Sequence, residues 1–150
     1  MTNPATDAKL SALYQEVILD HYRRPRNKGA LEAATSEASL RNPLCGDEVE
    51  VQVQMAEGRV ADVRFSGQGC SISQASASMM TELVKGRTAE EVRAIGERFA
   101  AMIRGDSAAA GDAALGQARA LSGVSRFPTR VRCAMIAWEA VARAVGSQEP

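Results

Sequence analysis

The sequence has few aromatic residues and no excess of either charge. Among 150 residues there are one Trp, two Tyr and three Phe, and 18 Lys and Arg balance 18 Asp and Glu. A protein that binds nucleic acid usually carries a basic surface, and many stack bases on aromatic side chains. The composition therefore argues against a nucleic-acid binder.

Long apolar runs are also missing. No stretch approaches the roughly 20 residues that a membrane-spanning helix requires, and the opening MTNPATDAKL lacks the basic and apolar segments of a signal peptide. The three cysteines are an odd number, which does not suit a disulfide framework. We therefore expect a cytoplasmic protein with no membrane segment, whose thiols serve metal binding, redox chemistry or core packing.

Alternating hydropathy predicts a small antiparallel sheet. The segment EVEVQVQM, 48–55, alternates strictly, Glu57 and Gly58 form a turn, and 59–67 continues as a second strand. Two such runs joined by a short turn containing glycine predict a hairpin. A third, short strand is predicted near 39–42.

Helices are predicted before and after this sheet. They cover 8–24, 71–85, 89–103 and a final segment from Pro128, with one or two short helices and flexible joints within 105–123. The apolar stripe of the last helix is Val131, Met135, Trp138, Ala142 and Val145. Asp7 is a predicted N-cap, and Thr88 with Glu91 forms a capping box. The expected fold class is α+β, one domain over 1–150 with helices packed on one face of a sheet of about three strands. Flexible ends are expected at 1–7 and 147–150.

The three cysteines fall near the ends of predicted elements. Cys45 precedes the first hairpin strand, with Asp47 two residues later, and Cys70 follows the second strand at a helix start. Because an antiparallel hairpin returns to its starting end, Cys45 and Cys70 can be neighbours. Cys133 lies in the first turns of the last helix, off its apolar stripe. Three thiolates and a carboxylate suit zinc or an iron–sulfur cluster better than calcium or magnesium.

Other interpretations stay open at this point. Four such ligands carry more negative charge than a divalent ion neutralises, and Arg130 and Arg132 beside the third cysteine could offset it. Yet the arginines could equally form a solvated face, each cysteine a small buried core residue, and Asp47 a turn residue. His21, the only histidine, is predicted to be a packed side chain rather than a ligand.

Four ordered motifs carry a resemblance to a known family. LYQEVILDHYRRPRNKG, NPLCGDEVEVQV, GQGCSISQASASMMTELVKG and RFPTRVRCAMIAWEA resemble the U-type iron–sulfur cluster assembly proteins, which include IscU, the NifU N-terminal domain and SufU. The resemblance runs from about residue 10 to 145. It implies a SufE/NifU-like fold and a metal site made by Cys45, Asp47, Cys70 and Cys133.

Two departures favour the SufU branch of that family. Scaffolds of the IscU type carry a histidine directly before the third cysteine, in an LPPVK-containing segment that a chaperone recognises. Here that position is Arg132, in RFPTRVRC, and a guanidinium that stays protonated cannot replace the imidazole as a ligand. The region 105–123 also resembles the insertion that distinguishes SufU from IscU.

The resemblance implies a zinc-dependent sulfur acceptor, a carrier of the sulfurtransferase type. Its partner would be a SufS-type cysteine desulfurase, whose persulfide sulfur passes to Cys45 and then to a scaffold such as a SufBCD-type complex. Because zinc blunts a bound thiolate, we expect Cys45 to leave the metal when the partner docks. Arg130 or Arg132 would stabilise the thiolate or persulfide anion, and the basic turn 23–28 would contribute to docking.

Two rival functions remain. The first is a scaffold that assembles a [2Fe–2S] cluster on the same four ligands. The second is a zinc-stabilised interaction module that regulates its desulfurase by docking alone, without chemistry.

Overall fold

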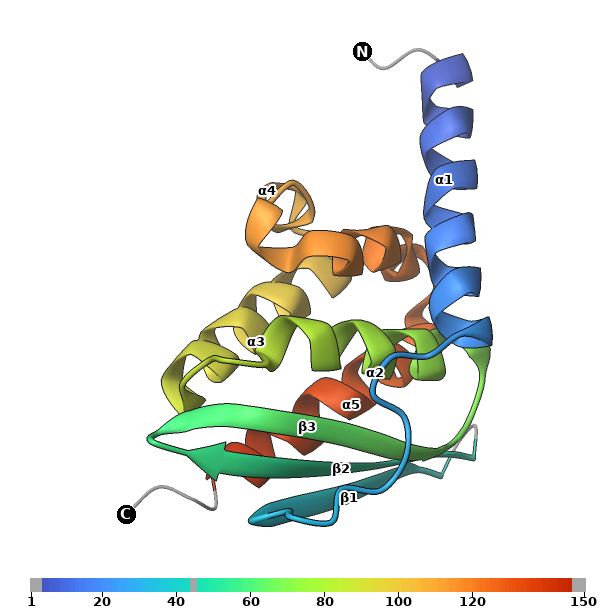
Figure 1. Ribbon diagram of the computed structural model, residues 1–150. Helices are drawn as coiled ribbons and strands as arrows, with labels where there is room; N and C mark the ends of the chain where they lie inside the picture. Colours follow the sequence, from blue (N-terminus) through green and yellow to red (C-terminus); the bar gives the residue numbers. More distant parts are fainter. Residues whose placement is uncertain (1–3, 44–45, 147–150) are drawn as a thin grey trace.

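The computed structural model describes the backbone of residues 4–43 and 46–146, and the side chains of this range from Tyr14 onward. Its elements, in chain order, are α1 (Pro4–Arg23), β1 (Ser36–Asn42), β2 (Asp47–Ala56), β3 (Arg59–Gln68), α2 (Ser71–Val84), α3 (Ala89–Ile103), α4 (Ser107–Ala110), the 3₁₀ helix η1 (Ala113–Arg126) and α5 (Pro128–Gly146). The strands form one antiparallel sheet in the order β1-β2-β3 (Figure 1).

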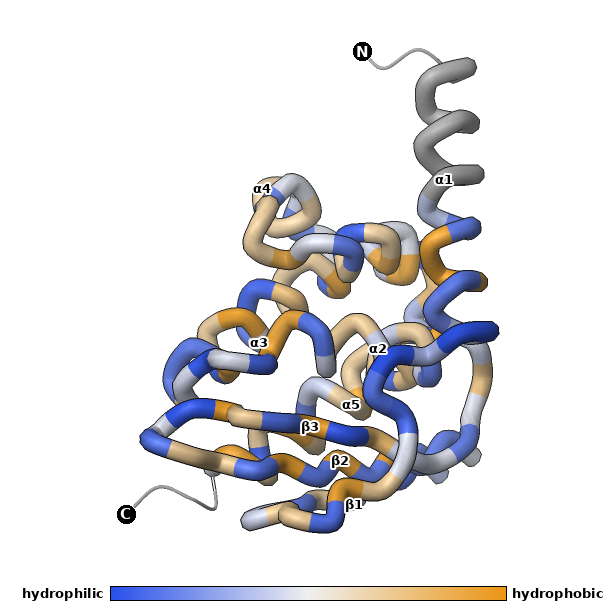
Figure 2. The backbone as a smooth tube through the Cα atoms, viewed as in Figure 1, coloured by the Kyte–Doolittle hydropathy of each residue, from blue (hydrophilic) through white to orange (hydrophobic). Residues whose placement is uncertain are grey.

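The helices cover one face of this sheet. Helix α5 packs on β1 and β2, while α2 packs on β3 (Figure 1). Val49, Val51 and Val53 of β2 are buried toward the helices, and the residues between them are half-buried on the other face. Apolar and polar residues accordingly alternate along the strands (Figure 2). Such alternation is typical of a sheet with one covered face and one open face. The predicted α+β class, with helices packed on one face of a three-stranded sheet, is confirmed.

The predicted hairpin is also confirmed. Glu57 and Gly58 both have positive φ angles, 54° and 76°, which is the backbone of a type I′ turn and matches the twist of the paired strands. A register shift follows Gln54, so Met55 pairs with Val60. Met55 is half-buried near the end of the sheet.

The first helix and the first strand both start earlier than predicted. Helix α1 begins at Pro4 instead of residue 8, and Asp7 lies inside it, so the prediction of Asp7 as N-cap is wrong. Proline is favourable in a first helical turn, where its missing N–H has no helical partner to lose. Strand β1 begins at Ser36 rather than residue 39. Within 4–43 and 46–146, no helix has the length and apolar character of a membrane span.

The segment after α1 lies against the sheet rather than free in solvent. Gly29 N–H donates to Phe65 O at 2.8 Å, and Phe65 N–H donates to Asn27 O at 3.0 Å. These bonds occupy the outer edge of β3, whose backbone groups need partners. The basic turn is therefore held in place along β3, which the sequence alone did not indicate.

The insertion forms an ordered cap over α3. Asp106 and Asp112 are the N-caps of α4 and η1, and their side chains accept hydrogen bonds from backbone N–H groups. Gly116, at φ 50° and ψ −132°, divides η1 into two parts. Leu115 and Leu121 are fully buried, so this region is anchored by its own apolar residues, and it continues to Arg126 rather than ending at 123.

Helix α5 is buried more widely than one stripe. It lies between the sheet and helices α2 and α3, and Trp138 stacks on Phe99 with ring centroids 4.7 Å apart. Cys133, predicted to lie off the apolar stripe, is only 1% exposed. That prediction is wrong because a helix covered on two sides buries more residues than its most apolar stripe. Val131, Met135 and Ala142 flank this buried face and are half-buried.

Candidate metal centre

Three predicted ligands meet where the sheet ends. Asp47 is the first residue of β2, Cys70 directly precedes α2, and Cys133 lies in the second turn of α5. One carboxylate oxygen and the two sulfur atoms all lie within 4.8 Å of one another. Asp47 is 0% exposed and Cys133 1% exposed, while Cys70 is partly exposed. The site is therefore buried on two sides and reaches the surface beside Cys70.

The Asp47 carboxylate is held by the neighbouring helix start. The backbone N–H of Cys70 donates to Asp47 Oδ1 at 3.0 Å. A buried carboxylate is costly unless hydrogen bonds or a cation compensate its charge. This bond compensates part of that charge, and it fixes the carboxylate beside the sulfur atoms of Cys70 and Cys133.

Two glycines make this approach of strand and helix feasible. A Cβ at Gly69 would lie 2.4 Å from both Asp47 Oδ1 and Ser73 Oγ, and a Cβ at Gly67 would lie 2.0 Å from Glu48 O. Atoms cannot approach so closely, so neither position can carry a side chain without displacing its neighbours. Gly69 thus lies directly against the Asp47 carboxylate, while Gly67 allows β3 to approach the backbone of β2 at Glu48.

The donor set fits zinc. Zinc binds thiolate sulfur at about 2.3 Å and carboxylate oxygen at about 2.0–2.2 Å in a tetrahedron, so ligand atoms already within 4.8 Å of one another need only a small contraction. Cys70 is the N-cap of α2, and the partial positive charge of a helix N-terminus favours a negative ligand in its vicinity. These three residues leave one tetrahedral position for a fourth ligand.

The remaining predicted site residues are Cys45, Arg130 and Arg132. Cys45, the proposed fourth ligand, lies outside the described residues. Arg130 and Arg132 are both exposed. Arg132 lines a groove of about 90 Å³ between β1 and α5, while Cys133, the next residue, points into the protein. The structure thus brings together Asp47, Cys70 and Cys133, and it leaves the arginines on the surface nearby.

His21 is a packed residue, as predicted, and does not belong to the metal centre. It is fully buried, its Nδ1 lies 2.7 Å from Ser78 Oγ, and its Nε2 lies 2.6 Å from Gln117 Oε1. These bonds tie α1 to α2 and to the insertion.

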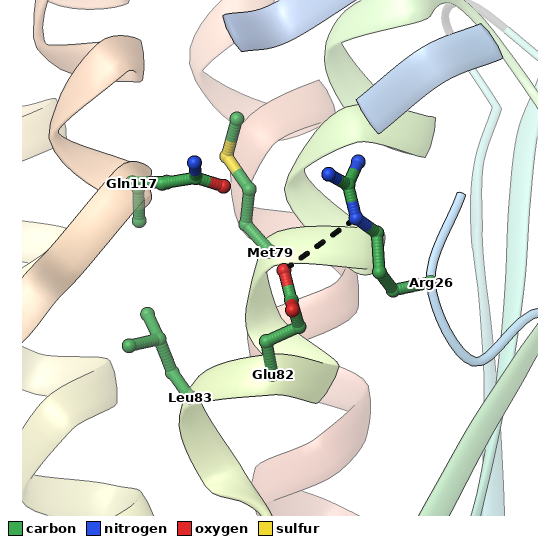
Figure 3. Close-up of a pocket in the computed structure, with 6 residues that line it drawn as sticks. Arg26, Met79, Glu82, Leu83 and Gln117 are labelled. Atoms are coloured by element: carbon green, nitrogen blue, oxygen red, sulfur yellow. Dashed lines mark ion pairs between the residues drawn. The ribbon is translucent and has the colours of Figure 1, made fainter. Parts of the chain in front are cut away.

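Beside His21 the surface opens into a pocket of about 290 Å³ between α2 and η1. Figure 3 shows Arg26 and Glu82 facing each other across it, with Arg26 Nε 3.8 Å from Glu82 Oε1, and Gln117 entering from η1. Arg26 also bonds Asp20 Oδ2 at 2.7 Å, which lowers the pKa of the Asp20 carboxyl. Arg26 is therefore already paired with carboxylates, and none of the predicted metal ligands lines this pocket.

The fold and the donor set define a class of protein. It is an α+β protein with one sheet, in which a carboxylate and two thiols meet between sheet and helices in a geometry suited to a metal ion. Residues 13–148 match the model of the NifU-like N terminal domain. Since this match covers most of the chain, the protein belongs to that family, and its predicted resemblance to the U-type assembly proteins is confirmed.

Individual relatives agree with this assignment. The zinc-dependent sulfurtransferase SufU of Bacillus subtilis (strain 168) is 41% identical over 147 residues, which cover 95% of this chain and 96% of the relative. The iron–sulfur cluster assembly scaffold protein IscU of Streptococcus pyogenes serotype M1 is 40% identical over 138 residues, covering 92% and 86%. The crystal structure of a putative scaffold protein for the SUF system of Fervidobacterium islandicum AW-1 superposes with a TM-score of 0.76 at 30% identity, covering 87% of this chain and 94% of that chain. The chain is thus SufU-like.

Proposed function

We propose that this protein is a zinc-dependent sulfur acceptor in iron–sulfur cluster assembly. The observation that carries the proposal is the meeting of Asp47, Cys70 and Cys133 within 4.8 Å, at a site that opens to the surface at Cys70. The likeness to a zinc-dependent sulfurtransferase along nearly the whole chain supports it. So does Arg132, which stands where a scaffold of the IscU type has a histidine. The proposed location is the cytoplasm.

The residues divide into holding and accepting groups. Asp47, oriented by the Cys70 N–H, and the buried Cys133 would hold zinc together with Cys70. Zinc bound there supplies a positive charge that keeps thiols of the site deprotonated. Cys45, two residues before Asp47 in the sequence, is the proposed acceptor.

The proposed transfer is a thiol–disulfide type of exchange. The Cys45 thiolate attacks the outer sulfur of a persulfide on a SufS-type cysteine desulfurase, and a new sulfur–sulfur bond forms at Cys45. The sulfur–sulfur bond of the donor breaks, and the donor cysteine leaves as a thiolate, so no external oxidant or reductant is needed. Arg130 and Arg132 are proposed to stabilise the resulting anion. A SufBCD-type complex is the proposed recipient of the sulfur.

The test is desulfurase turnover on cysteine, with reductant and without iron, in the presence and absence of the zinc-loaded protein. We expect strong stimulation that is lost in Cys45→Ser and after zinc removal. In a parallel reaction without reductant, which would remove the persulfide sulfur, mass spectrometry of the peptide containing Cys45 should show the mass of one added sulfur atom. Cys133→Ser is the companion variant, because it should lose zinc while Cys45 is still present.

Other outcomes identify the rivals. If Cys45→Ser still stimulates turnover, the protein regulates by docking alone. If there is little stimulation, but a visible absorption spectrum of a [2Fe–2S] cluster appears when iron and sulfide are supplied, the protein is a scaffold. The second result would match the scaffold function of the Streptococcus pyogenes relative, which is 40% identical to this chain over the aligned region.

A further inference from the structure

The two edges of the sheet differ. The outer side of β3 is occupied by residues 27–29 and by residues 86–87, which exchange backbone hydrogen bonds with Phe65 and Val60. Strand β1 pairs with β2 on its inner side, and in the described part of the chain no strand pairs with its outer side. Alternate N–H and C=O groups between Glu37 and Arg41 therefore point away from the sheet, and such an edge can pair with another strand.

Strand β1 lacks two features that often protect an edge from pairing, a proline and a bulge, while its charged residues are Glu37 and Arg41. It contains no proline or glycine, and no register shift interrupts its pairing with β2. Glu37 and Arg41 are exposed on the open face, while Ala38 and Leu40 are half-buried toward the helices. A groove between β1 and α5 is lined by Leu40 and Ile136 and by the charged residues Arg41, Arg132, Glu139 and Arg143.

The charges on β1 are arranged symmetrically about Ser39. Glu37 lies two residues before it and Arg41 two residues after it. A second β1 strand, antiparallel and centred on Ser39, therefore places Glu37 opposite Arg41 of the second copy, and Arg41 opposite Glu37 of the second copy. Opposite charges that face each other across strands are stabilising, and like charges are destabilising.

Other registers lack this complementarity. A slide of one residue puts exposed side chains of one strand opposite buried ones of the other. A slide of two residues loses both ion pairs, because Glu37 then faces Ser39 or Arg41 faces Ser39. A slide of four residues places Glu37 opposite Glu37, or Arg41 opposite Arg41. The sequence of β1 thus specifies one register for pairing with itself.

We propose that β1 is a self-association edge, at which two copies of this chain pair about a twofold axis through Ser39. The two three-stranded sheets then form one continuous sheet. Arg41, whose Nε donates to Glu48 Oε1 at 2.8 Å, would lie between Glu48 of its own chain and Glu37 of the second copy. Asp47 pairs with Asn42 at the end of β1, so the two metal centres lie at opposite ends of the shared strands.

The test uses two charge-reversal variants, Glu37→Arg and Arg41→Glu, in sedimentation velocity of the zinc-loaded protein over a concentration series. The wild-type dimer fraction should rise with concentration. Each variant alone faces like charges at both pairs, and its association should weaken by about tenfold or more. In an equimolar mixture, however, both pairs are complementary again, and a heterodimer should form at wild-type concentrations.

Controls carry the same charge changes away from β1. Glu97→Arg and Arg104→Glu alter exposed positions in and after α3, and both should associate as the wild type does. Circular dichroism and zinc content establish that each variant is folded. A wild type that stays monomeric at its highest soluble concentration overturns the proposal. So does a single variant that associates normally, or a mixture that stays monomeric.

Discussion

The backbone N–H of Cys70 donates a hydrogen bond of 3.0 Å to the carboxylate of Asp47, 23 residues earlier in the chain. This bond joins the start of β2 to the start of α2, so the sheet and the helix layer meet at the metal centre. A change that separates the two residues should lower the affinity for the metal more than it disturbs the packing of the core. The first two predictions follow from this relationship.

Gly69→Ala should weaken zinc binding. The new Cβ would lie 2.4 Å from Asp47 Oδ1 and from Ser73 Oγ, so the carboxylate must move. Displacing a group that orients a ligand typically costs about 10–100-fold in metal affinity. Competition with a chromophoric chelator measures this loss. Gly123→Ala is the matched control, because nothing lies within 4 Å of the Cβ it adds, and an equal loss in both variants would contradict the steric argument.

Zinc removal should lower the melting temperature. Without the ion, the buried Asp47 carboxylate and the neighbouring thiols lose the cation that compensates their charge. Structural zinc contributes about 10–16 kcal/mol in small peptides, but a domain with its own core should depend on it less. Each kcal/mol lost lowers the melting temperature by about 2–4 °C in a chain of this size. Hydrogen exchange should rise at 67–71, and an unchanged melting temperature after verified zinc loss would contradict the prediction.

Ser78→Ala should destabilise the protein without changing its zinc affinity. The Ser78 hydroxyl lies 2.7 Å from His21 Nδ1 and accepts from Arg26 N–H at 2.8 Å, and it is fully buried. Leaving buried polar groups without a partner costs about 1–3 kcal/mol. Denaturant unfolding, followed by the fluorescence of Trp138, measures the cost. Ser125→Ala, which removes a half-buried hydroxyl with one 3.3 Å bond, is the control. A matching loss of zinc affinity in Ser78→Ala would show that the two regions are coupled.

Asp112→Asn should destabilise the insertion in a manner that depends on pH. The hydrogen bond from Arg98 and that from the Ala114 N–H hold the pKa of Asp112 below its ordinary value of 3.8. A carboxyl whose pKa is lowered by folding stabilises the protein above its unfolded pKa, and that stabilisation is lost as the pH falls through the folded value. The difference between wild type and variant should therefore be present at neutral pH and disappear in acid.

An asparagine can still cap η1, so Asp112→Asn removes the charge and keeps the cap. Asp106→Asn is the matched control, because in the described part of the chain the Asp106 carboxylate accepts only from backbone N–H groups, those of Ala108 and Ala109. Equal pH dependence in both variants would exclude the Arg98 pair as the cause. Hydrogen exchange of η1 is the local measurement.

Much of the fold could be predicted from local pattern. The alternation at 48–55, the Glu57-Gly58 turn and the Thr88–Glu91 capping box each involve residues close in sequence, and all three are found. The extent of β1 was not predicted, because its limits depend on pairing with β2, which is distant in sequence from the start of β1. Local propensity cannot report such contacts.

By itself, the sequence determined the chemistry available to this protein: which residues can bind a metal, their order along the chain, and the absence of a histidine at position 132. Only the tertiary structure decided that Asp47, Cys70 and Cys133 meet, that Cys133 is buried, and that Gly69 lies against the Asp47 carboxylate. The physical reason is that these properties arise between segments far apart in sequence. A thiol can act as a metal ligand only where the fold brings other ligands beside it. A glycine is required only where the fold brings another atom too close for a Cβ.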